Sequence, residues 1–226
     1  MRAEQVMQEL QALGTEQNRK VYRRHGVGEN FYGVSFANLE MLRKKIKKDH
    51  TLAQQLWATG NHDARLLATK IADPARMDLE IIQAWAADLD NYIITDSFVS
   101  LLTQTPYARS LAEAWVDDPD EWLGRAGWHL VAQLAMHDPD LPDAYFDPYL
   151  EKIAQEVHGR ANRTREGMHN ALIAIGIRDA VLESRAIAVA EQIGPVYIDH
   201  GDTNCKTPDP IPYIHKAWAR QKARAA

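Results

Sequence analysis

Apolar side chains recur every three or four positions along almost the whole chain. Phe36, Leu39, Leu42 and Ile46 show this spacing within the segment 35–48. Such spacing places the apolar residues on one face of an α-helix. No stretch alternates apolar and polar residues between Asn-Gly or Asp-Gly turns, as the strands of a hairpin would. The pattern therefore predicts an all-α protein.

Glycine and proline residues divide this pattern into separate helices. The predicted helices cover residues 3–13, 15–24, 35–48, 50–58, 61–72, 78–88, 91–104, 107–116, 119–136, 142–158, 162–177, 179–193 and 213–224. Because the connections are short, we expect consecutive helices to pack as antiparallel neighbours. The composition of residues 194–212 predicts a loop, and we expect the helix at 213–224 to pack on the last repeat.

One short pattern recurs, an arginine followed by small and apolar residues, and its copies are centred on Arg65, Arg125 and Arg165. The last two arginines are about 40 residues apart, which is the period of HEAT-type helix pairs. Stacked helix pairs form a solenoid that presents one row of helices on a concave face. We therefore predict a single HEAT-like helical-repeat domain over residues 1–226, an α-α superhelix with these arginines on a concave basic face.

Basic side chains also gather in the run RKKIKK at 43–48, which contains Lys44, Lys45, Lys47 and Lys48. This run falls near the C-terminal end of a predicted helix. Cations at this end of a helix complement its dipole, and such runs are usually solvated faces. The alternative is a contact with nucleic-acid phosphates, which bind both lysine and arginine. Both interpretations stay open.

The composition limits the class of protein. The net charge of −5, from 26 basic and 31 acidic residues, favours a protein partner slightly over nucleic acid, but phosphate binding depends on local charge. A single cysteine, Cys205, excludes an internal disulfide and is typical of the reducing cytoplasm, where we expect the protein. No apolar run approaches the ~18 residues of a membrane span, so we expect no membrane association.

No cofactor and no metal site are predicted. Asp199, His200, Asp202 and Cys205 are residue types that zinc accepts as ligands, but their spacing matches no established zinc pattern. The chain also has no Gly-rich phosphate loop, no nucleophile elbow and no HExxH motif. Nucleotide hydrolysis, serine-hydrolase chemistry and zinc-protease chemistry therefore have no support in the sequence.

Four segments carry a resemblance to a known family: YGVSFANLEMLRKKIKK, LWATGNHDARLLATKIAD, YIITDSFVSLL and DEWLGRAGWHLVAQLA. They resemble the AlkD-like DNA alkylation-repair proteins, which are HEAT-repeat DNA glycosylases. On the active-site helix of that family, an aromatic residue is followed four positions later by Asp and then by Ser. Here these residues are Tyr92, Asp96 and Ser97. The W-L-x-R-A signature of the family is similar to residues 122–126, which contain Arg125.

The resemblance implies a DNA glycosylase that binds double-stranded DNA, including alkylated DNA, on its concave face. It would hydrolyse the N-glycosidic bond of cationic N3- or N7-alkylpurines without a cofactor. Asp96 would stabilise the positive charge that develops on the deoxyribose, and would orient the attacking water. Tyr92 would offer an aromatic face to the cationic base. Arg125 would hold a backbone phosphate beside the lesion.

Further DNA-binding residues are expected from the same resemblance. Arg65 and Arg165 occupy positions equivalent to Arg125 in their repeats, so they should contact phosphates on the same surface. Trp128 lies one helical turn after Arg125 and is a candidate to contact the alkylated base. The lysines of the 43–48 run would add positive charge to this DNA-binding surface.

Two positions depart from the family pattern, because Tyr92 and Asn170 stand where the family has tryptophan. Three functions therefore stay open: an alkylpurine glycosylase, a DNA-binding relative with weak or no catalysis, and a HEAT-repeat scaffold for protein partners. Without the resemblance, Asp96 would be interpreted as an N-cap or a hydrogen-bonded helix residue, and Tyr92 as a core residue. We expect a monomer.

Overall fold

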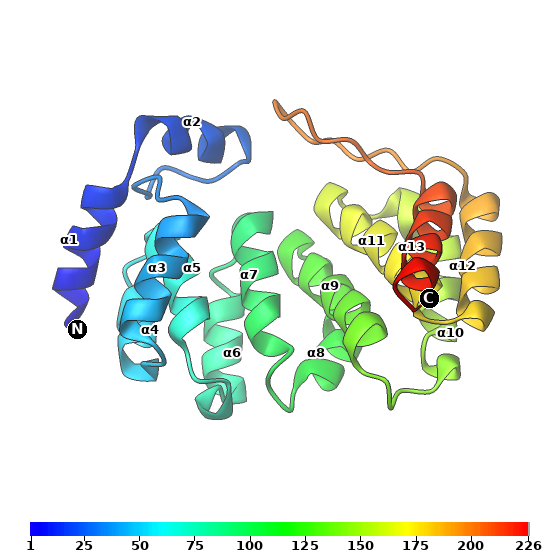
Figure 1. Cartoon of the computed structure of the whole chain (residues 1–226), viewed down its shortest axis with the longest axis horizontal. Helices are drawn as coiled ribbons and strands as arrows, with labels where there is room; N and C mark the ends of the chain where they lie inside the picture. The colour runs from blue at the N-terminus through cyan, green and yellow to red at the C-terminus, as the bar shows by residue number, and fades with distance from the viewer. Residues whose placement is uncertain (226) are drawn as a thin grey trace. The chain divides into compact units, whose positions relative to one another are not determined.

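The computed structural model describes residues 1–225, and within them the chain is helical with no β-strand (Figure 1). The all-α prediction is therefore confirmed. The α-helices are α1 (Ala3–Leu13), α2 (Glu16–Arg24), α3 (Phe36–Ile46), α4 (His50–Trp57), α5 (His62–Ile71), α6 (Leu79–Ala86), α7 (Tyr92–Leu102), α8 (Ala108–Trp115), α9 (Glu121–His137), α10 (Asp147–Glu156), α11 (Asn162–Arg178), α12 (Ala180–Ile193) and α13 (Pro210–Ala225). Short 3-10 helices are η1 (Pro74–Arg76), η2 (Asp143–Tyr145) and η3 (Val157–Gly159). Among the described helices, none has the length and apolar character that a membrane span needs.

Several helices begin at a residue whose side chain caps the first turn. Asn91 Oδ1 accepts two backbone N–H groups of α7, at 3.0 and 3.1 Å. Asp120 Oδ1 accepts two backbone N–H groups of α9, at 2.9 and 3.0 Å. A cap of this kind stabilises a helix by about 0.5–2 kcal/mol. These two caps fix where the helices that carry Asp96 and Arg125 begin.

Several predicted helix boundaries differ from the observed ones, and three of the differences have a local reason. The predicted helix 142–158 is divided into η2, α10 and η3, because Pro148 fits only in the first turn of a helix and so marks a new start. The last helix begins at Pro210 rather than at residue 213, again with proline in the first turn. Helix α3 ends at Ile46, because Lys47 adopts a φ of 65°.

The chain folds into two compact units, and a single HEAT-like repeat domain over 1–226 stays a prediction. The N-terminal unit consists of residues 1–107 and 200–204 and contains helices α1 to α7. The C-terminal unit consists of residues 108–199 and the residues from 205 onward, and it contains helices α8 to α13.

In the N-terminal unit, α5 is the central helix and packs against α3, α4 and α7. Trp57 of α4 stacks on Trp85 of α6, with ring centroids 4.1 Å apart and planes within 4° of parallel. Phe98 of α7 lies against both indoles, at 5.8 and 6.1 Å between centroids. This aromatic cluster buries one side of α7 and so determines which side remains partly exposed.

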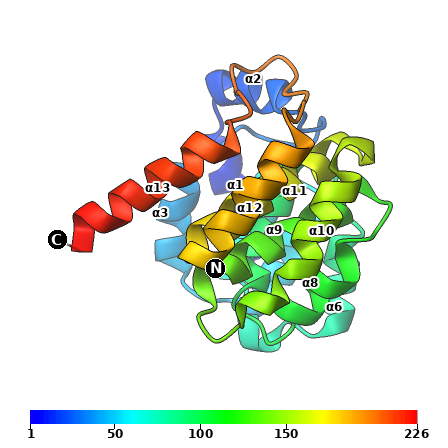
Figure 2. The same ribbon diagram turned by 90° about the vertical axis from the view of Figure 1, so that its right-hand side faces the viewer.

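In the C-terminal unit, α11 packs against α9, α12 and α13, and α8 packs on α9 (Figure 2). Two of these close helix contacts are possible because a glycine lies at the contact. A Cβ on Gly127 of α9 would lie 2.5 Å from the backbone N of Val116, which no side chain tolerates. A Cβ on Gly167 of α11 would lie 3.1 Å from Trp128 Cβ. The close packing of α9 with its neighbours therefore requires the small residues that this sequence has.

Candidate nucleic-acid interface

Helix α7 carries both residues predicted to act in catalysis. Tyr92 and Asp96 are four residues apart, so they lie on one face of the helix. Both are half-buried, whereas Ile94 and Phe98 on the other side of α7 are fully buried. Since Asn91 caps the helix, the alternative interpretation of Asp96 as an N-cap is wrong. The N-terminal unit thus carries a partly exposed tyrosine and a partly exposed carboxylate one turn apart.

The Tyr92 ring is held by a residue that the sequence did not single out. His25, the C-cap of α2, forms a hydrogen bond between its Nδ1 and Tyr92 Oη, and the ring centroids are 5.9 Å apart. At the next position of α7, Ile93 packs on an apolar cluster centred on Tyr22 of α2. Helix α2 therefore fixes the first turn of α7 and the orientation of the tyrosine on it.

Asp63 anchors the chain between α2 and α3. Its fully buried carboxylate accepts three backbone N–H bonds, from Tyr32 at 2.6 Å, Gly33 at 3.1 Å and Val34 at 2.8 Å. Burial raises the pKa of the Asp63 carboxyl, and the three N–H donors oppose that rise. Gly33 has a φ of 81°, and a Cβ there would lie 2.7 Å from Arg19 Cγ. This loop thus depends on a buried aspartate and a glycine.

Arg65, a predicted DNA-binding residue, is held within the N-terminal unit. Its Nη2 lies 2.9 Å from Asp88 Oδ2, and its Nη1 donates to the Asp88 carbonyl at 3.1 Å. Its Nε donates to the Trp57 carbonyl at 3.3 Å, and the guanidinium lies 5.2 Å from the centroid of that indole. The side chain is only 14% exposed. Its donors are directed at the protein, so the prediction of an exposed phosphate contact is corrected.

Arg125 is buried rather than displayed as a phosphate contact. Its side chain is 5% exposed, and its Nη1 lies 2.7 Å from Glu166 Oε2. The same carboxylate oxygen lies 2.8 Å from Arg163 Nη1. Arg125 Nη1 also donates to the Arg163 carbonyl at 3.4 Å. The ion pair joins α9 to α11 inside the C-terminal unit, and this interior role corrects the expectation of an exposed guanidinium.

Arg165 and Trp128 also have partners within the C-terminal unit. Arg165 Nη1 donates to the Tyr197 carbonyl at 2.8 Å, and its Nη2 donates to the Arg160 carbonyl at 2.9 Å. Trp128 is fully buried, and its indole N–H donates to the Val116 carbonyl at 3.2 Å. A fully buried indole has no face to offer a base, so the prediction that Trp128 contacts DNA is wrong.

The recurring arginine is therefore a structural element of the helix pairs. Arg65, Arg125 and Arg165 all lie near the start of their helices, and each donates to a main-chain carbonyl of another segment. The planar guanidinium has five donors and can bind several carbonyls at once. The repeat recognised in the sequence marks contacts that join successive segments.

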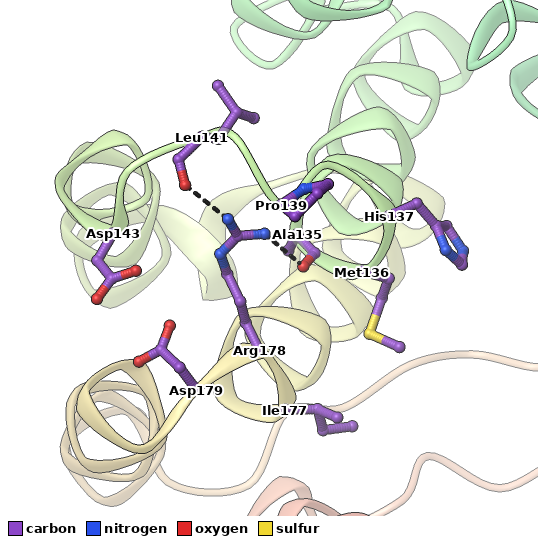
Figure 3. Close-up of a pocket in the computed structure, with 9 residues that line it drawn as sticks. All are labelled: Ala135, Met136, His137, Pro139, Leu141, Asp143, Ile177, Arg178 and Asp179. Carbon is purple, nitrogen blue, oxygen red and sulfur yellow. Dashed lines mark hydrogen bonds between the residues drawn. The ribbon is translucent and has the colours of Figure 1, made fainter.

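Arg178, at the end of α11, shows the same chemistry (Figure 3). Its guanidinium donates to the carbonyls of Ala135 at 3.0 Å, Asp138 at 2.7 Å and Leu141 at 2.6 Å. It also lies 5.0 Å from the ring centroid of Phe146. The side chain lines a cavity of about 630 Å³ and holds the connection between α9 and α10 in place.

All four lysines of the run at the end of α3 are exposed, and two of them form ion pairs. Lys45 pairs with Glu9 of α1 at 2.7 Å, and Lys48 pairs with an aspartate that follows α5 at 3.2 Å. Lys44 and Lys47 are exposed, and neither forms an ion pair within the part of the chain that the structure describes. Lys44 and Lys47 thus present amines that an incoming phosphate can reach without displacing a carboxylate.

Lys47 also has an unusual backbone. Its φ of 65° and ψ of −145° are the values at the C-cap of α3, and no other non-glycine residue among those described has a positive φ. This region of φ and ψ is largely restricted to glycine, and a side chain there costs about 1–3 kcal/mol. Strain of this kind gathers at functional positions. The lysine is present where glycine would fit better.

Comparison with known proteins gives the family. The protein-family model described as DNA alkylation repair enzyme matches residues 6–205. The chain belongs to this family. It is 30% identical to the uncharacterized protein Lin0241 of Listeria innocua over 223 residues, which is 96% of this chain and 97% of that protein. It is 29% identical to the uncharacterized protein Lmo0209 of Listeria monocytogenes over 225 residues, which is 97% of this chain and 98% of that protein.

A solved structure is also similar to this DNA alkylation repair family member. It is described as "a new family of proteins related to the HEAT-like repeat DNA glycosylases with affinity for branched DNA structures". The two align with a TM-score of 0.89 and 29% identity, over 98% of this chain and 95% of the other. The HEAT-like fold and the resemblance inferred from the sequence are both confirmed.

Sequence reasoning missed several residues that organise the site of this DNA alkylation repair family member. The His25 to Tyr92 pairing joins residues 67 positions apart, so no local motif marks it. Asp63 sits in a helix start, where an exposed carboxylate is the usual expectation. Within the described residues, no three His, Cys, Asp or Glu side chains gather as a metal site.

Proposed function

We propose that this protein recognises branched DNA through its phosphates, using the exposed lysines at the end of α3. The observation that carries the proposal is that Lys44 and Lys47 stay exposed while their neighbours form ion pairs. Amines placed in this way neutralise phosphates and release bound counterions. A related protein of 29% identity is described as having affinity for branched DNA structures, which supports the same ligand here.

The small number of accessible aromatic side chains favours a protein that binds DNA without efficient base excision. Aromatic faces attract a cationic base with about 0.5–2 kcal/mol each. Trp128 is fully buried, and Asn170 is an exposed polar residue where the family has tryptophan. Tyr92 is then the remaining aromatic side chain among the predicted base contacts. With one aromatic side chain in place of two or more, a cationic base would bind only slightly more tightly than a neutral base.

A titration of DNA structures tests the proposal. A three-way junction and a linear duplex with the same total number of base pairs are followed by fluorescence anisotropy at several salt concentrations. We expect tighter binding to the junction, and log K that falls linearly with log salt. Equal affinity for the two DNA forms contradicts branch recognition. No binding to either form at ~50 mM salt contradicts DNA binding altogether.

A second candidate function is excision of cationic alkylpurines, and the placement of Asp96 favours it. The carboxylate is partly exposed one turn after Tyr92. The bond between C1′ and the purine nitrogen would break with both electrons leaving on the purine, which becomes neutral. The deoxyribose would carry the positive charge, stabilised by the Asp96 carboxylate. A water molecule oriented by Asp96 would then add to C1′ and lose a proton.

Release of free methylpurine from methylated duplex DNA tests this second function. Excision by the wild-type protein that is abolished in Asp96→Asn supports it. Asp140→Asn is the matched control, because it makes the same change at an exposed position of the C-terminal unit. If the wild-type protein releases no methylpurine, excision is rejected, while the DNA-binding proposal is unaffected.

A further inference from the structure

The segment after α12 is extended and alternates in burial. Val196 is 8% exposed and Ile198 is 5% exposed, whereas Tyr197 between them is 75% exposed. An extended chain with one packed face produces this alternation. The segment is the orange chain that leaves α12 in Figure 1. No other large apolar or aromatic side chain in the described part of the protein is as exposed as Tyr197.

Helix α11 binds the backbone at Tyr197 and two residues after it. The side-chain amide of Asn162 makes two hydrogen bonds with the backbone of Asp199, donating to its carbonyl and accepting from its N–H, both at 2.8 Å. Arg165 Nη1 donates to the Tyr197 carbonyl at 2.8 Å. Together with the buried side chains on either side, these bonds fix the segment while the tyrosine ring faces solvent.

The arginines near the start of α11 differ in their partners. Arg160 pairs with Glu156 at 3.3 Å, and Arg163 pairs with Glu166 at 2.8 Å. Arg165 has no carboxylate partner within the described residues, because its terminal nitrogens bind main-chain carbonyls. One of these carbonyls belongs to Tyr197 itself. Arg165 therefore holds the main chain that carries the ring, rather than an acidic side chain.

We infer that Tyr197 is a stacking platform for an unpaired base at a DNA branch point, and that Arg165 is the residue that positions it. The inference rests on the proposed DNA-binding function. Every base has a π-face that stacks on an aromatic side chain. In a linear duplex, these faces are covered by neighbouring base pairs, whereas unpaired bases at a branch expose them. A ring on a fixed backbone loses little conformational freedom on binding.

Tyr197→Ala provides the direct test. The probe is a three-way DNA junction with unpaired 2-aminopurine at the branch point, and a fully paired linear duplex is the comparison. We expect Tyr197→Ala to weaken junction binding about tenfold and to leave duplex binding unchanged. Wild type should quench the 2-aminopurine fluorescence, and Tyr197→Ala should not. Tyr197→Phe and Tyr197→Trp should retain both properties, because stacking needs the ring and not the hydroxyl.

Tyr213→Ala is the matched control, since Tyr213 is 50% exposed on α13. It should behave as wild type in both assays. If Tyr197→Ala binds the junction as tightly as wild type does, the stacking role is rejected and DNA binding by other residues stands. If wild type binds neither DNA form, both this inference and the proposed function are rejected.

A double-mutant cycle tests the positioning role of Arg165. Arg165→Ala should weaken junction binding about as much as Tyr197→Ala does, and the double variant should be no weaker than either single variant. The slope of log K against log salt should not change in Arg165→Ala. A slope lower by about 0.9, with additive effects in the double variant, would make Arg165 a direct phosphate ligand and overturn its positioning role.

Discussion

Arg125 Nη1 lies 2.7 Å from Glu166 Oε2, and this pair ties α9 to α11 inside the C-terminal unit. Glu166 is only 18% exposed and also receives Arg163. Removing one partner from a buried pair leaves the other charge without compensation. The pair therefore links the recurring arginine of the sequence to the stability of the fold.

Arg125→Ala should lower the free energy of unfolding by about 3 kcal/mol, because it leaves the Glu166 carboxylate with one fewer partner in a buried setting. Urea denaturation measures this change. The matched control is Arg185→Ala, which removes an exposed pair with Asp147 and should cost less than about 1 kcal/mol. Equal decreases in the two variants would contradict an interior role for Arg125.

His62 should make the fold sensitive to acid. It is 5% exposed, and burial lowers its pKa from 6.5 to about 4. Between pH 6.5 and 4 the unfolded chain therefore binds a proton at this residue and the folded chain does not. The contribution of His62 to the free energy of unfolding is fully present above pH 6.5. It decreases as the pH falls towards 4, by up to about 3 kcal/mol in total.

His62→Gln removes this titration, so its stability should fall less than that of wild type between pH 6.5 and 4. Denaturation with urea at several pH values measures the difference. His137→Gln, at an exposed position, should follow the wild-type profile. A His62→Gln profile parallel to that of wild type would show that the burial of His62 does not control the response to acid.

Lys47→Gly should raise stability and weaken DNA binding at the same time. Glycine adopts a φ of 65° without strain, so we expect a gain of about 1 kcal/mol in the free energy of unfolding. Removal of the amine should reduce affinity for the DNA junction. Lys44→Gly lies inside α3 and should instead cost about 1 kcal/mol. A Lys47→Gly variant that is less stable than wild type would contradict the strain at this residue.

The sequence was a good guide to the helices, because capping residues and apolar spacing are local signals. Thr15 and Ser35 are the N-caps of α2 and α3, and both are residue types that are favoured at this position. The predicted helix boundaries were wrong where a single residue interrupts the helix although the apolar spacing continues. Pro148 does this at α10 and Lys47 does it after α3. Local propensity does not reveal such an interruption when the surrounding apolar spacing continues.

The candidate site was harder to predict, because the same residue types serve packing and binding. Arg65 and Arg125 have the spacing of repeat-equivalent residues, but their guanidinium groups bind carbonyls and carboxylates within the protein. Their burial depends on tertiary contacts more than 20 residues away in the chain. The sequence predicted only a loop over residues 194–212, and the alternating burial around Tyr197 became evident with its anchoring by Asn162.

The salt dependence of junction binding tests the central claim most directly. The slope of log K against log salt is compared for wild type, Lys44→Ala/Lys47→Ala, and the control Lys216→Ala, which removes an exposed lysine of α13. The account predicts that the double variant lowers the slope by about 1.8, or about 0.9 for each phosphate that is no longer neutralised, and that the control leaves it unchanged. A slope that stays at the wild-type value in Lys44→Ala/Lys47→Ala would contradict the assignment of these lysines as the phosphate-binding surface.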